Sequence, residues 1–145
     1  MNILFLCTGN YYRSRFAEEY FNNLARSRSL PHRAASRGIG MNFERLKNPG
    51  PISMDVIVTL KAMGILVNAP VRRPRKLRPE EALLFDRIIC MDKKEHLPLV
   101  KKNKALKGVK VEYWNVKDLG EVPAAVGLTA CRKKVEGLIQ EISNS

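Results

Sequence analysis

The chain opens on an apolar run that does not alternate with polar side chains. Residues 2–6 read Asn-Ile-Leu-Phe-Leu, which is the pattern of a strand buried on both faces of a parallel sheet. Further signals at 32–39, 86–91 and 109–114 predict three more strands. The segments between them are long enough for helices, and parallel strands require such crossover connections. The pattern therefore predicts an α/β fold, a doubly wound parallel sheet with helices on both faces.

Helical spacing of apolar residues and capping signals predict the helices of this fold. The expected ranges are 14–28, 53–63, a short helix from residue 79, 93–103 and 123–142. Pro98 falls inside the fourth range and is expected to kink that helix or to begin a second segment. The 145 residues suit one ordinary domain, and no repeat or linker divides them. We expect a single domain over residues 1–145.

The balance of charge narrows the choice of partners. The chain has 26 Lys and Arg against 14 Asp and Glu, a formal net charge of +12, which favours nucleic acid, acidic lipid, acidic protein or phosphorylated substrates. Two clusters hold much of the excess: Arg72, Arg73, Arg75, Lys76 and Arg78, and Lys93, Lys94, Lys101, Lys102, Lys104, Lys107 and Lys110. Either cluster is a solvated surface or steers an anionic partner. Aromatic residues do not interleave with these lysines, so nucleic acid is possible but not favoured.

Compartment and cofactor use follow from what the sequence lacks. No apolar run approaches the roughly 20 residues of a spanning helix, and the N-terminus has no basic region of a signal peptide. Cysteines at 7, 90 and 131 are widely spaced and odd in number, which argues against a disulfide framework or a paired zinc site. We expect a cytoplasmic protein in a reducing compartment, with no membrane partner, metal or organic cofactor, and no catalytic role for the lone His32 and His96.

The segment between the first strand and the first helix has the residues of a phosphate-binding loop with a nucleophile. Residues 7–14 read Cys-Thr-Gly-Asn-Tyr-Tyr-Arg-Ser. Five residues between Cys7 and Arg13 can turn backbone N–H groups inward, and the helix N-terminus adds positive potential. Arg13 can bind two phosphate oxygens, and the same surroundings favour the thiolate form of Cys7. The expected phosphate-binding residues are Thr8, Gly9, Asn10, Tyr11, Tyr12 and Ser14, the last also bonding the sulfur.

This segment resembles the signature of the low-molecular-weight protein tyrosine phosphatases. That family also places its signature directly after the first strand, and the chain is similar to it at 36–38, at 85–86 and at 91–92. The resemblance implies a four-stranded parallel sheet in the order 2-1-3-4. It further implies hydrolysis of phosphomonoesters through a phosphocysteine, with phosphotyrosine protein or a small aryl phosphate as substrate. Tyr12 stands where many family members have a second, protective cysteine.

Cleavage of a phosphomonoester by a thiolate needs a proton for the leaving oxygen. Asp118 lies just past the fourth expected strand, on the same sheet edge as Cys7, and is the candidate general acid and base. Its position is similar to that of the family's general acid, which normally sits in an Asp-Pro pair followed by aromatics. Here Leu119 and residues 120–121, Gly-Glu, follow instead. Asp92, after the third strand, is expected to hold a loop.

Two other functions stay open. Arsenate reductases of this fold and signature use further cysteines after the third strand in a redox relay, and Cys90 occupies a suggestive place. The next cysteine after it is Cys131, so the relay is incomplete, and both thiols are expected to pack in the core. Alternatively, a regulatory module would bind phosphate or an anionic partner through the Cys7 loop without turnover.

Overall fold

A four-stranded parallel sheet runs through the centre of the computed structural model, which describes residues 1–144. Its strands are β1 (Asn2–Cys7), β2 (Arg33–Gly38), β3 (Arg87–Cys90) and β4 (Glu112–Tyr113). They lie in the order β2-β1-β3-β4, and each neighbouring pair is parallel. The predicted fold class and strand order are confirmed.

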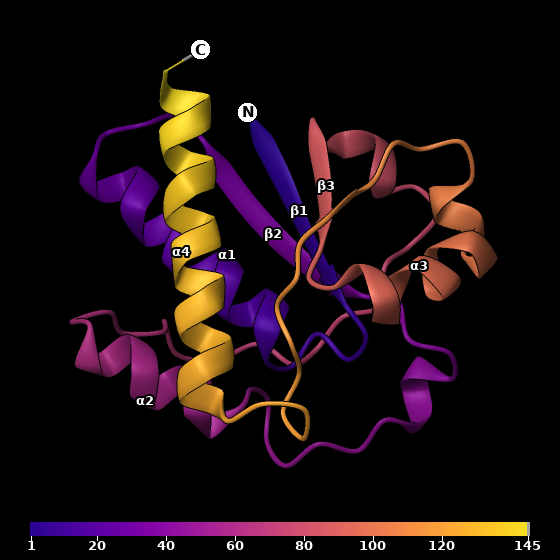
Figure 1. The fold of residues 1–145 in the computed structure, drawn as a ribbon, viewed down its shortest axis with the longest axis horizontal. Helices are drawn as coiled ribbons and strands as arrows, with labels where there is room; N and C mark the ends of the chain where they lie inside the picture. The colour runs from indigo at the N-terminus through magenta and orange to yellow at the C-terminus, as the bar shows by residue number, and fades with distance from the viewer. Residues whose placement is uncertain (145) are drawn as a thin grey trace.

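Helices cover both faces of this sheet (Figure 1). They are α1 (Arg13–Ser27), α2 (Met54–Ala62), α3 (Lys93–Lys102) and α4 (Ala124–Ser143). Side chains alternate along β1, so Ile3 and Phe5 join the core formed by α1, α2 and α4, while Leu4 and Leu6 join a second core on the α3 side. Burial on both faces explains why the β1 sequence is continuously apolar. None of the described helices is long and apolar enough to cross a membrane.

Three elements differ from the sequence expectation. β4 is shorter than the strand expected at 109–114, because Val109 donates its N–H to the Leu106 carbonyl (3.1 Å) and so belongs to a turn. α3 continues through Pro98 as one helix, since a single proline removes only one N–H from its hydrogen-bond ladder. The short helix expected from residue 79 is instead the 3-10 turn Ala82–Leu84. The 3-10 turn begins later in the chain because Glu81 belongs to a preceding turn, in which its N–H donates to the Arg78 carbonyl and its carboxylate accepts the Arg78 N–H.

The carboxyl ends of β1, β3 and β4 place three loops at one edge of the sheet, where ligands bind in open α/β folds. Met91 continues β3 by donating its N–H to the Leu6 carbonyl at 3.0 Å, and Val116 follows β4 by donating to the Met91 carbonyl at 2.8 Å. These bonds bring the segment that contains Asp118 beside the loop that contains Cys7.

Candidate active site

The loop between β1 and α1 surrounds the sulfur of Cys7 with hydrogen-bond donors. The Asn10 N–H donates to Cys7 Sγ at 3.2 Å, and Ser14 Oγ lies 2.9 Å from the same sulfur. Ser14 Oγ already accepts a bond from the Asn10 side chain at 2.9 Å, which leaves its own proton free to point at the sulfur. Both groups are placed to donate to negative charge on the sulfur. Cys7 is 3% exposed, at the floor of the loop.

The Asn10 side chain uses all of its hydrogen-bonding capacity to shape this loop. Its amide nitrogen donates to Ser14 and to Ser36 Oγ (2.8 Å), and its oxygen accepts from Arg72 Nη1 and from the Arg75 N–H, both at 3.0 Å. Two donors and two lone pairs are thereby satisfied inside the protein. The backbone at Asn10 has φ of 49°, the left-handed conformation that asparagine tolerates better than most residues.

Replacing Asn10 by alanine is expected to lower the free energy of unfolding by roughly 3 kcal/mol, because buried partners lose their bonds and the left-handed backbone is strained. Asn42 is a matched control: it also has a left-handed backbone (φ 53°), but it is exposed and makes no side-chain cap. Asn42→Ala should cost only about 1 kcal/mol. Urea unfolding measures both variants, and equal losses would show that the Asn10 bonds contribute nothing.

Arg72, from the first basic cluster, belongs to the interior support of the loop. Its Nη2 donates to Glu18 Oε1 and to Ser36 Oγ, both at 2.9 Å. This ion pair ties the segment before β3 to α1 and β2. The solvated-surface and steering interpretations of the first cluster are therefore wrong for Arg72, whose charge is already neutralised by Glu18.

Arg13 is fixed from two sides while it faces the cavity above Cys7. Nη1 donates to the Val116 carbonyl at 3.0 Å, and Nη2 donates to Glu95 Oε2 at 2.7 Å. The residue is 2% exposed. Burial lowers the pKa of Arg13, but the bond to Glu95 and the neighbouring negative charges raise it above its ordinary value. The guanidinium is therefore a permanent, oriented cation at the site.

Glu95 is a member of the site that the sequence analysis missed. Besides Arg13, it accepts a bond from Thr8 Oγ1 at 2.5 Å, and it lies 3.1 Å from Nε2 of the buried His96. Burial raises the pKa of Glu95, but contacts from His96, Arg13 and Thr8 outweigh it and hold the pKa well below its usual range. The sequence signal that could have indicated Glu95 is its position in the first turn of α3, directly after the end of β3.

Glu95→Gln should reduce stability in a pH-dependent way. Because the folded pKa of Glu95 lies below the unfolded value of about 4.3, its stabilisation is complete above that value and declines as pH falls through the folded pKa. The loss of unfolding free energy should thus be largest near neutral pH and shrink in acid. Urea titrations across this range measure it. Glu80→Gln, at an exposed position, is the control. A loss of unfolding free energy in Glu95→Gln that does not change with pH would contradict the expectation.

Asp118 lies beside the same cavity, with its Oδ2 atom 3.5 Å from Arg13 Nη2. Its other oxygen accepts the Leu119 N–H at 2.9 Å, which orients the carboxylate. The side chain is 44% exposed, so it can reach solvent and a bound substrate. Asp92 has the loop-holding position that was expected: it caps α3 through the Glu95 N–H (3.1 Å) and pairs with Lys117 (3.0 Å), next to Asp118.

A cavity of about 280 Å³ opens over Cys7. It is lined by Cys7, Thr8, Gly9, Tyr11, Tyr12, Arg13, Leu46, Asn48, Asp118 and Leu119. The first six and Asp118 are residues that the sequence singled out, whereas Asn10 and Ser14 lie fully buried beneath the loop. Leu119 directly follows Asp118 in the chain. Leu46 and Asn48 were not anticipated, because no local pattern marks them.

Two tyrosines form the aromatic part of this cavity. The Tyr11 hydroxyl donates to the Pro49 carbonyl, which holds the ring against the loop that follows β2. Tyr12 is 5% exposed, and burial, together with the charges of Asp55 and Asp118, raises its pKa to about 12. The Tyr12 ring is therefore a neutral wall of the cavity at physiological pH.

The remaining cysteines pack in the core as expected. Cys90 and Cys131 are both free and fully buried, and burial raises the pKa of each thiol. Buried thiols of raised pKa are poor nucleophiles, which weighs against a redox relay through Cys90. Among residues 1–144, no group of three or more His, Cys, Asp or Glu side chains is placed to hold a metal ion.

Comparison with known proteins agrees with this geometry. The family model described as low molecular weight phosphotyrosine protein phosphatase matches residues 2–123. No curated protein sequence gives a significant match. Among solved structures, YfkJ from Bacillus subtilis is similar, with 23% identity, a TM-score of 0.80, and coverage of 99% of this chain and 95% of that one.

Two further solved structures cover nearly the whole chain. The low molecular weight protein tyrosine phosphatase from T. tengcongensis has 26% identity and a TM-score of 0.71, covering 99% of this chain and 98% of its own. The YwlE arginine phosphatase from Geobacillus stearothermophilus has 20% identity and a TM-score of 0.74, and the match covers 99% of this chain and 93% of that one. The family match over residues 2–123 shows that the chain belongs to the low molecular weight phosphotyrosine protein phosphatases and is a cysteine-based phosphatase of this fold.

Proposed function

We propose that the chain hydrolyses phosphotyrosine in proteins through a phosphocysteine intermediate formed on Cys7. One observation carries the proposal. The sulfur of Cys7 has two hydrogen-bond donors at 2.9 and 3.2 Å and lies at the floor of a cavity that Arg13 and Asp118 also line. Nucleophile, cation and proton donor thus meet around one space.

In the first step, the Cys7 thiolate attacks phosphorus and an S–P bond forms as the ester P–O bond breaks. The N–H groups of Arg13 that are not engaged by Val116 and Glu95 bind the phosphoryl oxygens. They stabilise the charge of the transition state together with the loop amides. Asp118, protonated at this stage, gives its proton to the departing phenol oxygen.

In the second step, a water molecule attacks the phosphocysteine. The carboxylate left on Asp118 accepts a proton from that water, the S–P bond breaks, and inorganic phosphate is released. The electron pair returns to sulfur, where the Asn10 N–H and the Ser14 hydroxyl stabilise the thiolate as the leaving group. The same Asp118 therefore serves as acid and then as base.

The cavity wall favours an aryl phosphate over a phosphoarginine. Tyr11, Tyr12, Leu46 and Leu119 offer ring and aliphatic contacts, whereas Asp118 is the one carboxylate among the described lining residues. A guanidinium substrate would need a partner for its positive charge, and Asp118 is already engaged in proton transfer. Phosphoarginine remains the second candidate, because a structurally similar protein is an arginine phosphatase.

Substrate choice is tested with two peptides that differ only in the phosphorylated residue, one carrying phosphotyrosine and the other phosphoarginine. We expect kcat/KM to be at least about tenfold higher for phosphotyrosine, the scale on which pocket contacts discriminate substrates. Phosphate release measures both. The reverse preference would replace tyrosine by arginine in the proposal and leave the cysteine chemistry intact.

A further inference from the structure

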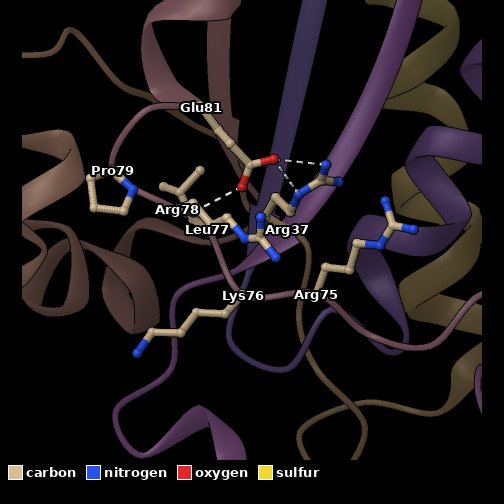
Figure 2. Close-up of a pocket in the computed structure, with 7 residues that line it drawn as sticks. All are labelled: Arg37, Arg75, Lys76, Leu77, Arg78, Pro79 and Glu81. Atoms are coloured by element: carbon tan, nitrogen blue, oxygen red, sulfur yellow. Dashed lines mark hydrogen bonds and ion pairs between the residues drawn. The ribbon is translucent and has the colours of Figure 1, made fainter.

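A second and larger cavity, of about 710 Å³, lies beside the carboxyl end of β2. Four basic side chains and one carboxylate line it, as Figure 2 shows: Arg37, Arg75, Lys76, Arg78 and Glu81. None of these residues lines the cavity over Cys7. Three of them, Arg75, Lys76 and Arg78, belong to the first basic cluster, and the chemistry proposed at Cys7 does not use their side chains.

The backbone beneath this cavity is held in place by β2. The Gly38 N–H donates to the Arg75 carbonyl at 2.7 Å, and the Leu77 N–H donates to the Gly38 carbonyl at 3.0 Å. Residues 75–77 thus extend the sheet beyond β2, with Gly38 paired to Lys76. Successive side chains of such a segment point to opposite sides, and Figure 2 shows Arg75 and Lys76 extending in opposite directions.

Positive charge in this cavity is only partly neutralised. Glu81 pairs with Arg37 at 2.8 Å and accepts the Arg78 N–H at 2.8 Å. Lys76 has one exposed partner, Glu44. The guanidinium groups of Arg75 and Arg78 make no hydrogen bond or ion pair within residues 1–144. These two cations are exposed and available to an anionic ligand.

An adjoining cavity of about 420 Å³ shares Lys76, Leu77 and Pro79 with the first. It adds Lys102 and Lys104 from the second basic cluster, with Ile39, Met41 and Leu99 as apolar lining. The residues that line these two cavities are called the basic groove below. The two basic clusters, far apart in the sequence, thus meet on one surface, and no aromatic ring is among the described residues that line it.

We propose that the basic groove docks an acidic segment of a partner protein, an extended peptide in which Asp or Glu residues alternate with apolar ones. The cations are spread along the groove instead of converging on one point, which suits an extended polyanion. The groove also has apolar lining, including the exposed Met41, which suits a peptide better than a bare phosphate chain. The lack of aromatic rings leaves nucleic-acid bases without a stacking surface.

The groove begins next to the catalytic loop. The N–H groups of Ile39 and Gly40, which line it, donate to the Cys7 and Thr8 carbonyls at 3.0 Å each. A protein docked there has its neighbouring residues close to the Cys7 cavity. Docking itself does not depend on catalysis, whereas the role of the docked protein as a phosphotyrosine substrate rests on the proposed function.

Binding is tested on the full chain by fluorescence anisotropy with a labelled, unphosphorylated peptide of alternating Glu and Leu. In Arg78→Gln/Lys104→Gln, Kd should rise at least about tenfold, since two charge contacts are lost. Lys61→Gln/Lys133→Gln removes the same charge at exposed positions of α2 and α4, and Kd should change by less than about twofold. Equal losses in both pairs, or tighter groove-dependent binding of single-stranded RNA or tripolyphosphate, would overturn the proposal.

A kinetic arm separates this proposal from the proposed function. Adding the Glu-Leu segment to a phosphotyrosine peptide should lower KM in the unmodified protein but not in Arg78→Gln/Lys104→Gln, while hydrolysis of p-nitrophenyl phosphate stays equal in both. Groove-dependent binding without phosphotyrosine hydrolysis would contradict the proposed function and leave the docking proposal intact. Hydrolysis of the phosphotyrosine peptide with equal KM with and without the Glu-Leu segment would contradict the docking proposal and leave the proposed function intact.

Discussion

Cys7→Ser is expected to lose at least about 10⁴-fold in kcat/KM toward p-nitrophenyl phosphate, the scale seen when a covalent nucleophile is removed. In the proposed mechanism, the Asn10 N–H and the Ser14 hydroxyl stabilise the Cys7 sulfur as an anion. A serine hydroxyl at this place is not ionised near neutral pH, so the attacking species is lost. Initial rates of nitrophenol release measure the effect.

Cys90→Ala is the matched control for this loss, because Cys90 is another buried thiol, at the end of β3 and outside the cavity. The Cys90→Ala variant should hydrolyse p-nitrophenyl phosphate at the rate of the unmodified protein. Acid quenching during turnover of a radiolabelled substrate should trap phosphate on the unmodified protein and not on Cys7→Ser. An active Cys7→Ser enzyme would show that Cys7 is not the nucleophile. Loss of activity in Cys90→Ala would support a redox relay through Cys90.

Asp118→Asn should lower kcat on phosphotyrosine by about 10²- to 10³-fold, within the range for loss of a general acid. Asparagine keeps the shape and can still accept the Leu119 N–H, but it has no proton to give. The fall should be much smaller with an aryl phosphate whose phenol is a strong acid, because that oxygen leaves unprotonated. The ratio of kcat between poor and good leaving groups is the measurement.

Asp92→Asn serves as the comparison for Asp118. Asp92 caps α3 and pairs with Lys117, and it does not line the cavity. Its replacement should lower stability and leave the ratio between the two leaving groups unchanged. If Asp118→Asn slows both substrates equally, Asp118 positions Arg13 and the proton comes from another group.

The sequence alone predicts those features of the fold and the site whose residues lie close together in the chain. The loop from Cys7 to Ser14 lies within one short segment, and its chemistry depends on residue types at fixed spacing, so the sequence alone places it between β1 and α1. Helix caps such as Ser53, which accepts the Asp55 N–H at 3.2 Å, are local in the same way. The strand order, by contrast, came from the family resemblance.

What the sequence missed depends on tertiary contact. Glu95 reaches Arg13 only because β3 pairs beside β1 and α3 starts at that sheet edge. Arg72 looked like surface charge within a basic cluster, yet its partners Glu18 and Ser36 come from α1 and β2. No spacing rule connects residues so distant in the chain, and a charged side chain has no periodicity of its own to reveal burial.

The bonds of Asn10 link the formation of the site to the formation of the whole fold. Its side chain takes partners from α1, from β2 and from the segment at 72–75. The loop therefore reaches its observed shape only after β1, α1, β2 and the segment at 72–75 have assembled. A partly folded intermediate that had β1 and α1 alone would contain the nucleophile without an ordered phosphate site. Binding of an oxyanion should accordingly report on global folding, and such a ligand should stabilise the protein as a unit.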